Sequence, residues 1–92
     1  MLAQITKSQA MDFGRFNIRV NCILPGYIKT NMTKKSQNNN LRSKTIRDRT
    51  ILSRWGEPKD LQGAAIFLLS NASNYITGTE IVVDGGWLVK GI

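Results

Sequence analysis

The spacing of two strand-like segments most limits what this chain can fold into. Residues 17–24 (NIRVNCIL) predict a β-strand because apolar side chains alternate along one face, at Ile18, Val20, Cys22 and Leu24. Residues 79–83 (TEIVV) predict a second strand, and the Gly85-Gly86 pair after it predicts a turn. A helix is predicted between the two strands. Strand, helix and strand in this order are typical of a parallel α/β unit.

Two strands alone cannot form a buried parallel sheet. Such a sheet needs partner strands, and it needs helices over both of its faces. The chain has 92 residues and shows no internal repeat and no linker between domains. We therefore expect this sequence to be one end of a larger α/β domain.

Two helices are predicted from composition and from signals at their ends. Residues 1–13 contain good helix formers without proline or glycine, and Gly14 is well placed to end the helix. Residues 57–71 predict the stronger helix, with Pro58 in its first turn. Gly63 lies inside this second helix and suggests close packing against a neighbour.

The residue types exclude several kinds of site. The chain contains no histidine, so we expect neither a zinc site nor a Ser-His catalytic triad, and no metal. The single cysteine, Cys22, excludes an intrachain disulfide, fits a reducing cytoplasm and is expected to be a small core residue. No apolar run approaches the roughly 20 residues of a membrane span, and the N-terminus lacks a signal-peptide pattern. A cytoplasmic protein without a membrane partner is expected.

The positive charge is concentrated in one segment. The formal net charge is +7, and residues 29–59 hold nine basic and two acidic residues, which accounts for the whole excess. Such a segment attracts nucleic acid, a membrane surface or an anionic substrate, or it is simply a solvated face. A nucleic-acid-binding protein is disfavoured because Trp55 is the only aromatic residue of the segment and no recognition motif is present.

Four blocks of sequence carry a family resemblance. They are Asn-Ile-Arg-Val-Asn at 17–21, Pro-Gly-x-Ile-x-Thr at 25–30, Arg-x-Gly-x-Pro-x-Asp at 54–60 and Thr-Gly-x-x-Ile-x-Val-Asp-Gly-Gly at 77–86. In this order they resemble the C-terminal third of the short-chain dehydrogenase/reductase (SDR) family, over nearly the whole chain. The resemblance implies an α/β fold: the C-terminal part of a Rossmann-like, doubly wound parallel sheet. Residues 1–92 would then be a fragment of one dinucleotide-binding domain, incomplete in isolation.

The resemblance also implies a cofactor, NAD or NADP, across the carboxyl ends of the strands. Four residues match the family's cofactor-binding positions in the loop after residues 17–24: Pro25, Gly26, Ile28 and Thr30. In the family, the backbone at the position of Ile28 contacts the carboxamide, and the hydroxyl at the position of Thr30 hydrogen-bonds the cofactor. Pro25 fixes φ and Gly26 admits unusual backbone angles. Taken without the family, a Pro-Gly pair after a strand is a plain turn.

The resemblance places residues 31–52 in the family's substrate-binding loop, a mobile lid over the active site. Residues 34–40 (KKSQNNN) predict a mobile loop there, and residues 41–52 predict a weak helix. The basic side chains of the lid would favour a substrate that bears a carboxylate or a phosphate. Neutralising three of them is expected to raise KM for anionic ketones more than for neutral ones: Lys34, Lys35 and Arg42.

Two motifs of the family are absent from the sequence. It contains no Gly-rich loop for the pyrophosphate, and neither Tyr27 nor Tyr75 begins the Tyr-x-x-x-Lys pair that moves the proton. Residues 2–11 resemble the helix just after that pair, so no catalytic residue is expected within this chain. We expect the isolated chain to be inactive, as a fragment of a reading frame, a remnant, or a product whose start is an internal methionine.

The function implied for the parent enzyme is that of an NAD(P)-dependent oxidoreductase that interconverts a secondary alcohol and a ketone. The parent would act on a small molecule as a homo-oligomer. Residues 84–92 (DGGWLVKGI) resemble members that act on sugar acids and polyols, and reduction of a 3-oxoacyl thioester is a comparable alternative. A non-catalytic remnant, or a dimerisation module formed by residues 61–83, is the other alternative.

Overall fold

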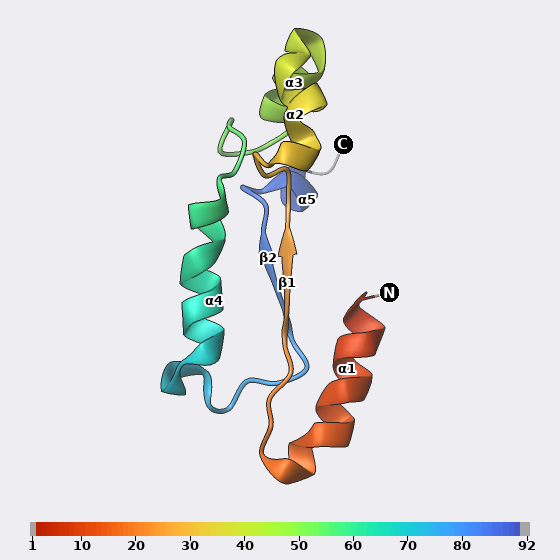
Figure 1. Ribbon diagram of the computed structural model, residues 1–92, viewed down its shortest axis with the longest axis vertical. Coiled ribbons are helices and arrows are strands. Elements are labelled where there is room, and N and C mark those ends of the chain that lie inside the picture. The colour runs from red at the N-terminus through yellow and green to blue at the C-terminus, as the bar shows by residue number, and fades with distance from the viewer. Residues whose placement is uncertain (1, 91–92) are drawn as a thin grey trace. The chain divides into compact units, whose positions relative to one another are not determined.

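The computed structural model describes residues 2–90. Its helices and strands in chain order are α1 (Leu2–Phe13), β1 (Cys22–Pro25), α2 (Lys34–Asn38), α3 (Asn40–Asp48), α4 (Gln62–Leu69), β2 (Glu80–Val83) and α5 (Trp87–Lys90) (Figure 1). Of the described residues, 2–24 and 63–82 form one compact unit, and 25–62 and 83–90 form a second.

The two strands pair as a two-stranded parallel sheet, which confirms the predicted arrangement. The ladder begins at Cys22, whose N–H donates to the carbonyl of Thr79 at 2.9 Å. It is shorter than the strand predicted over residues 17–24. The reason is that a side chain replaces a ladder bond before Cys22, because the N–H of Val20 donates to Thr77 Oγ1 at 3.1 Å.

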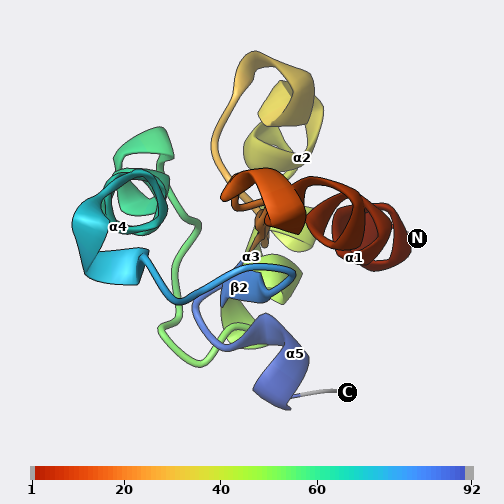
Figure 2. The same cartoon turned by 90° about the horizontal axis from the view of Figure 1, so that it is seen from below.

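In the first unit, α1 and α4 lie on opposite sides of the strands, as Figures 1 and 2 show together. α1 ends at Phe13, immediately before Gly14, as predicted. The left-handed residue that follows is Asn17, with φ 60°, because a short 3-10 helix continues the chain beyond Gly14. Asparagine tolerates this conformation better than most residues.

The packing predicted at Gly63 is not found. No atom of the described residues lies within 4 Å of the position that a Cβ on Gly63 would take. Neighbouring apolar side chains on α4 are also exposed, with 66% of Ile66 and 86% of Leu69 accessible. Cys22 is half-buried rather than a core residue. Apolar surface left open in this way is what the sequence predicted for one end of a larger α/β domain.

The second unit contains α2, which replaces the mobile loop predicted over residues 34–40. That prediction is wrong because hydrogen bonds of nearby polar side chains hold the segment, and apolar packing is not needed. The amide of Gln37 donates to the carbonyl of Thr30 at 3.0 Å, and Arg42 Nε donates to Ser36 Oγ at 3.1 Å. α3 confirms the weak helix predicted over residues 41–52, although it is shorter.

The second unit also contains α5, which the sequence did not predict. It follows the predicted Gly85-Gly86 turn, where φ is 64° and 92°. The carboxylate of Asp84 starts the helix: Oδ1 accepts from the N–H of Gly86 at 2.8 Å, and Oδ2 accepts from the N–H of Leu88 at 3.0 Å. This use of an aspartate satisfies backbone donors that have no partner within the helix.

Candidate functional site

The loop predicted to meet the cofactor begins at the end of β1 and lies in the second unit. The N–H of Gly26 donates to the carbonyl of Val83 at 3.0 Å. A Cβ on Gly26 would lie 2.7 Å from Asp84 Cβ, so any larger residue would require the backbone to shift. The φ of Gly26 is not positive. Glycine is therefore needed here for space, which corrects the expectation that it supplies an unusual backbone angle.

The backbone of Ile28 is presented by an isolated parallel bridge to Gly56. The N–H of Gly56 donates to the carbonyl of Tyr27, and the N–H of Lys29 donates to the carbonyl of Gly56, both at 2.9 Å. In a parallel bridge of this kind, the polar groups of the middle residue point away from the partner. The carbonyl of Ile28 accepts from Thr33 Oγ1 at 2.9 Å. The N–H of Ile28 has no acceptor among residues 2–90, so it can donate to a ligand.

Thr30 is held by its main chain, and its side chain is exposed. Its N–H donates to Thr33 Oγ1 at 2.9 Å, and its carbonyl accepts from Gln37 Nε2 at 3.0 Å. Gln37 Nε2 also donates to Thr33 Oγ1 at 2.8 Å. Thr33 and Gln37 therefore fix the loop that carries Ile28 and Thr30. Neither was predicted to matter, because Gln37 lies in the polar stretch 34–40 and Thr33 lies just before it.

An ion pair closes the segment that faces Ile28. Arg54 Nη1 donates to Asp60 Oδ2 at 2.9 Å, and the N–H of Glu57 donates to the same oxygen at 2.8 Å. The Arg54 guanidinium, and then the Glu57 N–H, lower the pKa of Asp60 to about 2. A Cβ on Gly56 would lie 2.5 Å from Ile28 Cδ1. The Arg-x-Gly-x-Pro-x-Asp block is thus a closed turn whose glycine lies against Ile28.

Aromatic side chains fill the space beneath the same loop. Trp55 is buried, and its Nε1 donates to Ser43 Oγ at 3.0 Å. The ring of Tyr27 packs edge-on against Trp55, with centroids 5.8 Å apart, and against Trp87, with centroids 4.8 Å apart. The Arg49 guanidinium lies 4.6 Å from the centroid of the Trp87 ring. The sequence offered one signal for this cluster, which is that Trp55 lies inside the Arg-x-Gly-x-Pro-x-Asp block.

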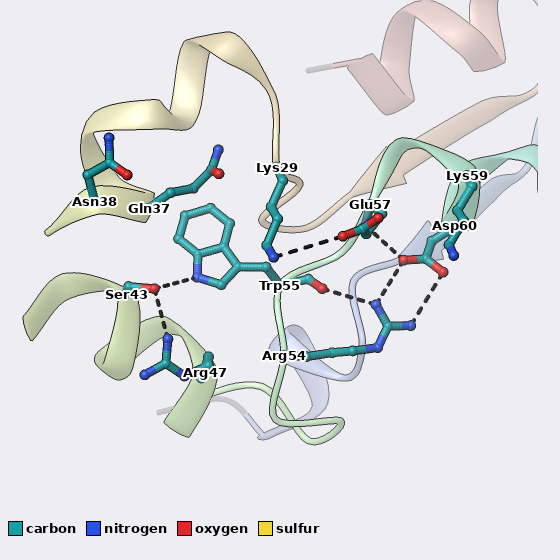
Figure 3. Close-up of a pocket in the computed structure, with 10 residues that line it drawn as sticks. All are labelled: Lys29, Gln37, Asn38, Ser43, Arg47, Arg54, Trp55, Glu57, Lys59 and Asp60. Carbon is teal, nitrogen blue, oxygen red and sulfur yellow. Dashed lines mark hydrogen bonds and ion pairs between the residues drawn. The ribbon is translucent and has the colours of Figure 1, made fainter. Parts of the chain in front are cut away.

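An open pocket of about 820 Å³ lies beside the loop, within the second unit (Figure 3). Its walls come from the loop after β1, from α2 and α3, and from residues 54–60. Six of its lining residues are charged: Lys29, Arg47, Arg54, Glu57, Lys59 and Asp60. The three cations that the sequence singled out do not line it: Lys34, Lys35 and Arg42.

The residues present fit one part of a nicotinamide cofactor. The free N–H of Ile28 beside the exposed hydroxyl of Thr30 is an arrangement that can meet an amide. Within residues 2–90, no group of three or more His, Cys, Asp or Glu side chains lies close enough to hold a metal ion. In the same part of the chain, no helix is long and apolar enough to cross a membrane.

Comparisons with known proteins agree with this geometry. A family model described as enoyl-(acyl carrier protein) reductase matches residues 1–88. The 2-dehydro-3-deoxy-D-gluconate 5-dehydrogenase of Dickeya dadantii is 50% identical over 86 residues, which are 94% of this chain and 34% of that protein. The crystal structure of a gluconate 5-dehydrogenase from Burkholderia cenocepacia, in complex with NADP and tartrate, has a TM-score of 0.93 at 35% identity. It is matched over 96% of this chain and 34% of its own length.

A third relative was solved with NADH in place of NADP. A 4-hydroxyisoleucine dehydrogenase complexed with NADH has a TM-score of 0.91 at 40% identity, over 96% of this chain and 36% of that one. The chain thus spans about a third of the length of each of these relatives. The described strands and helices correspond to part of a Rossmann fold.

Proposed function

Because this chain belongs to the short-chain dehydrogenase/reductase family, we propose that it forms the C-terminal part of an NAD(P)-dependent oxidoreductase that interconverts a secondary alcohol and a ketone. The observation that carries the proposal is the loop from Pro25 to Thr30, with its free Ile28 N–H. This loop follows the carboxyl end of a parallel strand, where open α/β sheets bind ligands.

Two of the proposed cofactor-binding residues contact the cofactor, and the other two shape the loop. When bound, the nicotinamide supplies or accepts the hydride at the carbonyl carbon. The N–H of Ile28 donates to its carboxamide, and the hydroxyl of Thr30 bonds the cofactor. Pro25 and Gly26 set the path of the loop, since Gly26 alone allows the close approach to Asp84. The proton step belongs to residues outside this chain, because none of the 92 residues forms a Tyr-x-x-x-Lys pair.

A sugar acid is the proposed substrate, and residues 31–52 are proposed to form the substrate-binding loop. The names of the relatives above include two enzymes of gluconate-type substrates, and a sugar acid carries a carboxylate at neutral pH. The excess of basic residues between 29 and 59 favours such an anion. The parent enzyme is proposed to be a cytoplasmic homo-oligomer. The exposed apolar side chains of Ile66 and Leu69 on α4 support an oligomer, because a second subunit would cover them.

Reduction of a 3-oxoacyl thioester is the second candidate function. The matching family model is named for an enoyl-(acyl carrier protein) reductase, which reduces a carbon–carbon double bond, so its name supports an acyl thioester as ligand and not the ketone reduction itself. Such thioesters are larger than sugar acids and carry their charge far from the reacting carbon. The two candidates therefore differ in the substrate and share the cofactor and the chemistry.

A hybrid enzyme tests the proposal. The 86 matching residues of this chain replace those of the Dickeya dadantii dehydrogenase, with which they are 50% identical. We expect the hybrid to oxidise or reduce a gluconate-type sugar acid with NAD or NADP. Activity on a 3-oxoacyl thioester alone would select the second candidate. A folded hybrid that binds neither NAD nor NADP would contradict the cofactor assignment.

The 92-residue chain on its own supplies the complementary test. We propose that it has no dehydrogenase turnover, because the groups that bind the pyrophosphate and move the proton are absent from it. The measurement is cofactor-dependent ketone reduction by the purified chain. Turnover above that of a Thr30→Val, Gly26→Val control would contradict the proposal.

A further inference from the structure

We propose that the pocket in Figure 3 binds the sugar-acid substrate, with its carboxylate at Lys29 and Arg47 and its other end toward Lys59. This inference rests on the proposed function, because it names the part of the chain that recognises an anionic sugar acid. It also replaces the three cations that the sequence singled out with a different set.

The charges that line the pocket do not cancel. Arg54 and Asp60 neutralise each other, with Nη1 and Oδ2 2.9 Å apart. Lys29 Nζ lies 3.8 Å from Glu57 Oε1, which is a loose contact between two half-exposed side chains and contributes little. Among residues 2–90, no carboxylate lies within ion-pair distance of Arg47 or Lys59. The pocket therefore holds two positive charges without a partner carboxylate, and it favours an anion.

Arg47 is held in place while most of its donors stay available. Its Nη1 donates to Ser43 Oγ at 2.9 Å, and Ser43 is buried. The same Ser43 oxygen accepts from Trp55 Nε1 at 3.0 Å, so both of its lone pairs are used. A guanidinium has five N–H donors, and a forked pair of them matches a carboxylate. The buried Trp55–Ser43 pair thus positions Arg47 to receive one.

The pocket is also suited to hydroxyl groups. The side chains of Gln37 and Asn38 line it, and each has an amide oxygen that can accept from a hydroxyl. Its volume of about 820 Å³ lies within the range of small-molecule sites, roughly 300–1,000 Å³. A molecule with a carboxylate and several hydroxyls satisfies both sets of groups, whereas an acyl chain satisfies neither.

The pocket is joined to the loop that is proposed to meet the nicotinamide. Lys29 lies between Ile28 and Thr30 in sequence and lines the pocket. Gln37 lines it too, and its amide donates to the carbonyl of Thr30. A carboxylate bound here is therefore held by residues of the same loop that would hold the cofactor.

Lysine labelling tests the site without any need for turnover. The 92-residue chain and the hybrid are each acetylated briefly in potassium gluconate, in potassium phosphate or in potassium chloride at equal ionic strength. Mass spectrometry then compares the four lysines. We expect gluconate to slow labelling of Lys29 and Lys59 about threefold or more relative to Lys34 and Lys35, with less protection by phosphate. Equal protection of all four lysines, or equal protection by phosphate, would overturn the proposal.

Kinetics of the hybrid separate this inference from the proposed function. One variant carries Lys29→Gln, Arg47→Gln and Lys59→Gln, and a matched variant carries Lys34→Gln, Lys35→Gln and Arg42→Gln. Both lose the same net charge. We expect the first to raise KM for a sugar acid about tenfold or more, with a several-fold smaller change for a neutral ketone. The matched variant is expected to raise it several-fold less.

Two results would overturn the inference and leave the proposed function intact. The first is an active hybrid in which both triple variants raise KM equally. The second is an active hybrid in which the pocket variant affects anionic and neutral substrates alike. Failure of the hybrid to bind any nicotinamide cofactor would instead count against the proposed function, and the labelling experiment would still decide whether the pocket binds gluconate.

Discussion

Arg19 is hydrogen-bonded to Ser73, the one side chain with no exposed surface among the buried residues of the described chain. Arg19 Nη1 donates to Ser73 Oγ at 2.9 Å, and Nη2 donates to the carbonyl of Leu68 at 3.0 Å. Further carbonyls of Ser70 and Ile76 accept from the same guanidinium. Arg19 thus satisfies acceptors at the C-terminal end of α4, where a helix leaves carbonyls without partners and favours a cation.

Replacing Arg19 should destabilise the protein through the loss of these bonds. Arg19→Ala in the hybrid enzyme is expected to lower the free energy of unfolding by roughly 2–3 kcal/mol, since charge-assisted hydrogen bonds are lost and acceptors are left unpaired. Arg19→Lys should recover only part of this, because an ammonium cannot copy the planar fork. Urea unfolding followed by circular dichroism is the measurement. Arg15→Ala is the control, since Arg15 contacts the exposed Phe16 ring, and equal effects at both positions would contradict the prediction.

Gly26 and Gly63 should respond in opposite ways to alanine. A methyl group at Gly26 would lie 2.7 Å from Asp84 Cβ, so Gly26→Ala must move the loop that carries Ile28. We expect it to weaken NAD(P) binding by the hybrid about tenfold or more, measured by equilibrium titration.

Gly63→Ala meets open space in this chain and removes a helix-interior glycine, so it should stabilise the isolated chain by about 1 kcal/mol. A destabilising Gly63→Ala in the hybrid would show that a neighbour packs there in the longer protein. A Gly26→Ala variant with unchanged cofactor affinity would contradict the steric account of the loop.

The regular elements were predictable where the pattern of apolar residues is local. Helix α1 and a helix near Gly63 follow from composition and from the signals at their ends, and the strands follow from short runs of apolar and β-branched residues. α2 was missed because its support comes from polar side chains: Gln37 donates to the carbonyl of Thr30, seven residues away, and Arg42 donates to Ser36 Oγ. α5 was missed because a helix of four residues has no periodicity, and its start depends on the carboxylate of Asp84.

The candidate site also has features that the sequence predicted and features that it did not. The positions of Ile28 and Thr30 came from the family resemblance, and not from the spacing of residues in the loop. What makes the Ile28 N–H free is its bridge to Gly56, which lies on another segment and has no local signal. The pocket cations differ from those expected because net charge along a sequence does not say which side chains face one cavity. Lys34 and Lys35 belong to the basic segment, yet they lie outside the pocket.

The pair formed by Trp55 and Ser43 should show measurable coupling. Ser43→Ala leaves the buried Trp55 N–H without an acceptor, which costs about 1–3 kcal/mol of unfolding free energy. Trp55→Phe removes the donor together with part of the ring. The double variant should therefore cost less than the sum of the two single variants, by about 1 kcal/mol. Thermal unfolding of the four hybrid proteins gives the cycle, and strictly additive effects would show that the bond contributes nothing.

Acid should weaken the turn that faces Ile28. The Arg54 guanidinium and the Glu57 N–H lower the pKa of Asp60 to about 2, below its ordinary 3.8. A group whose pKa is lower in the folded state adds stability that is present above its unfolded pKa, near pH 4, and is lost as the pH falls toward 2. Asp60→Asn should remove this dependence. The measurements are the unfolding free energy between pH 5 and pH 2 and the carboxyl NMR titration of Asp60.

Asp48 provides the matched control for Asp60. The pKa of Asp48 is also lowered, first by its hydrogen bond with Lys44, but both side chains of that pair are more than half exposed. Exposed pairs of this kind within one helix contribute little to stability. Asp48→Asn should therefore leave most of the acid dependence in place, while Asp60→Asn flattens it. If lowering the pH destabilises both variants as much as it destabilises the unmodified protein, the closed turn at residues 54–60 does not depend on the Arg54–Asp60 pair.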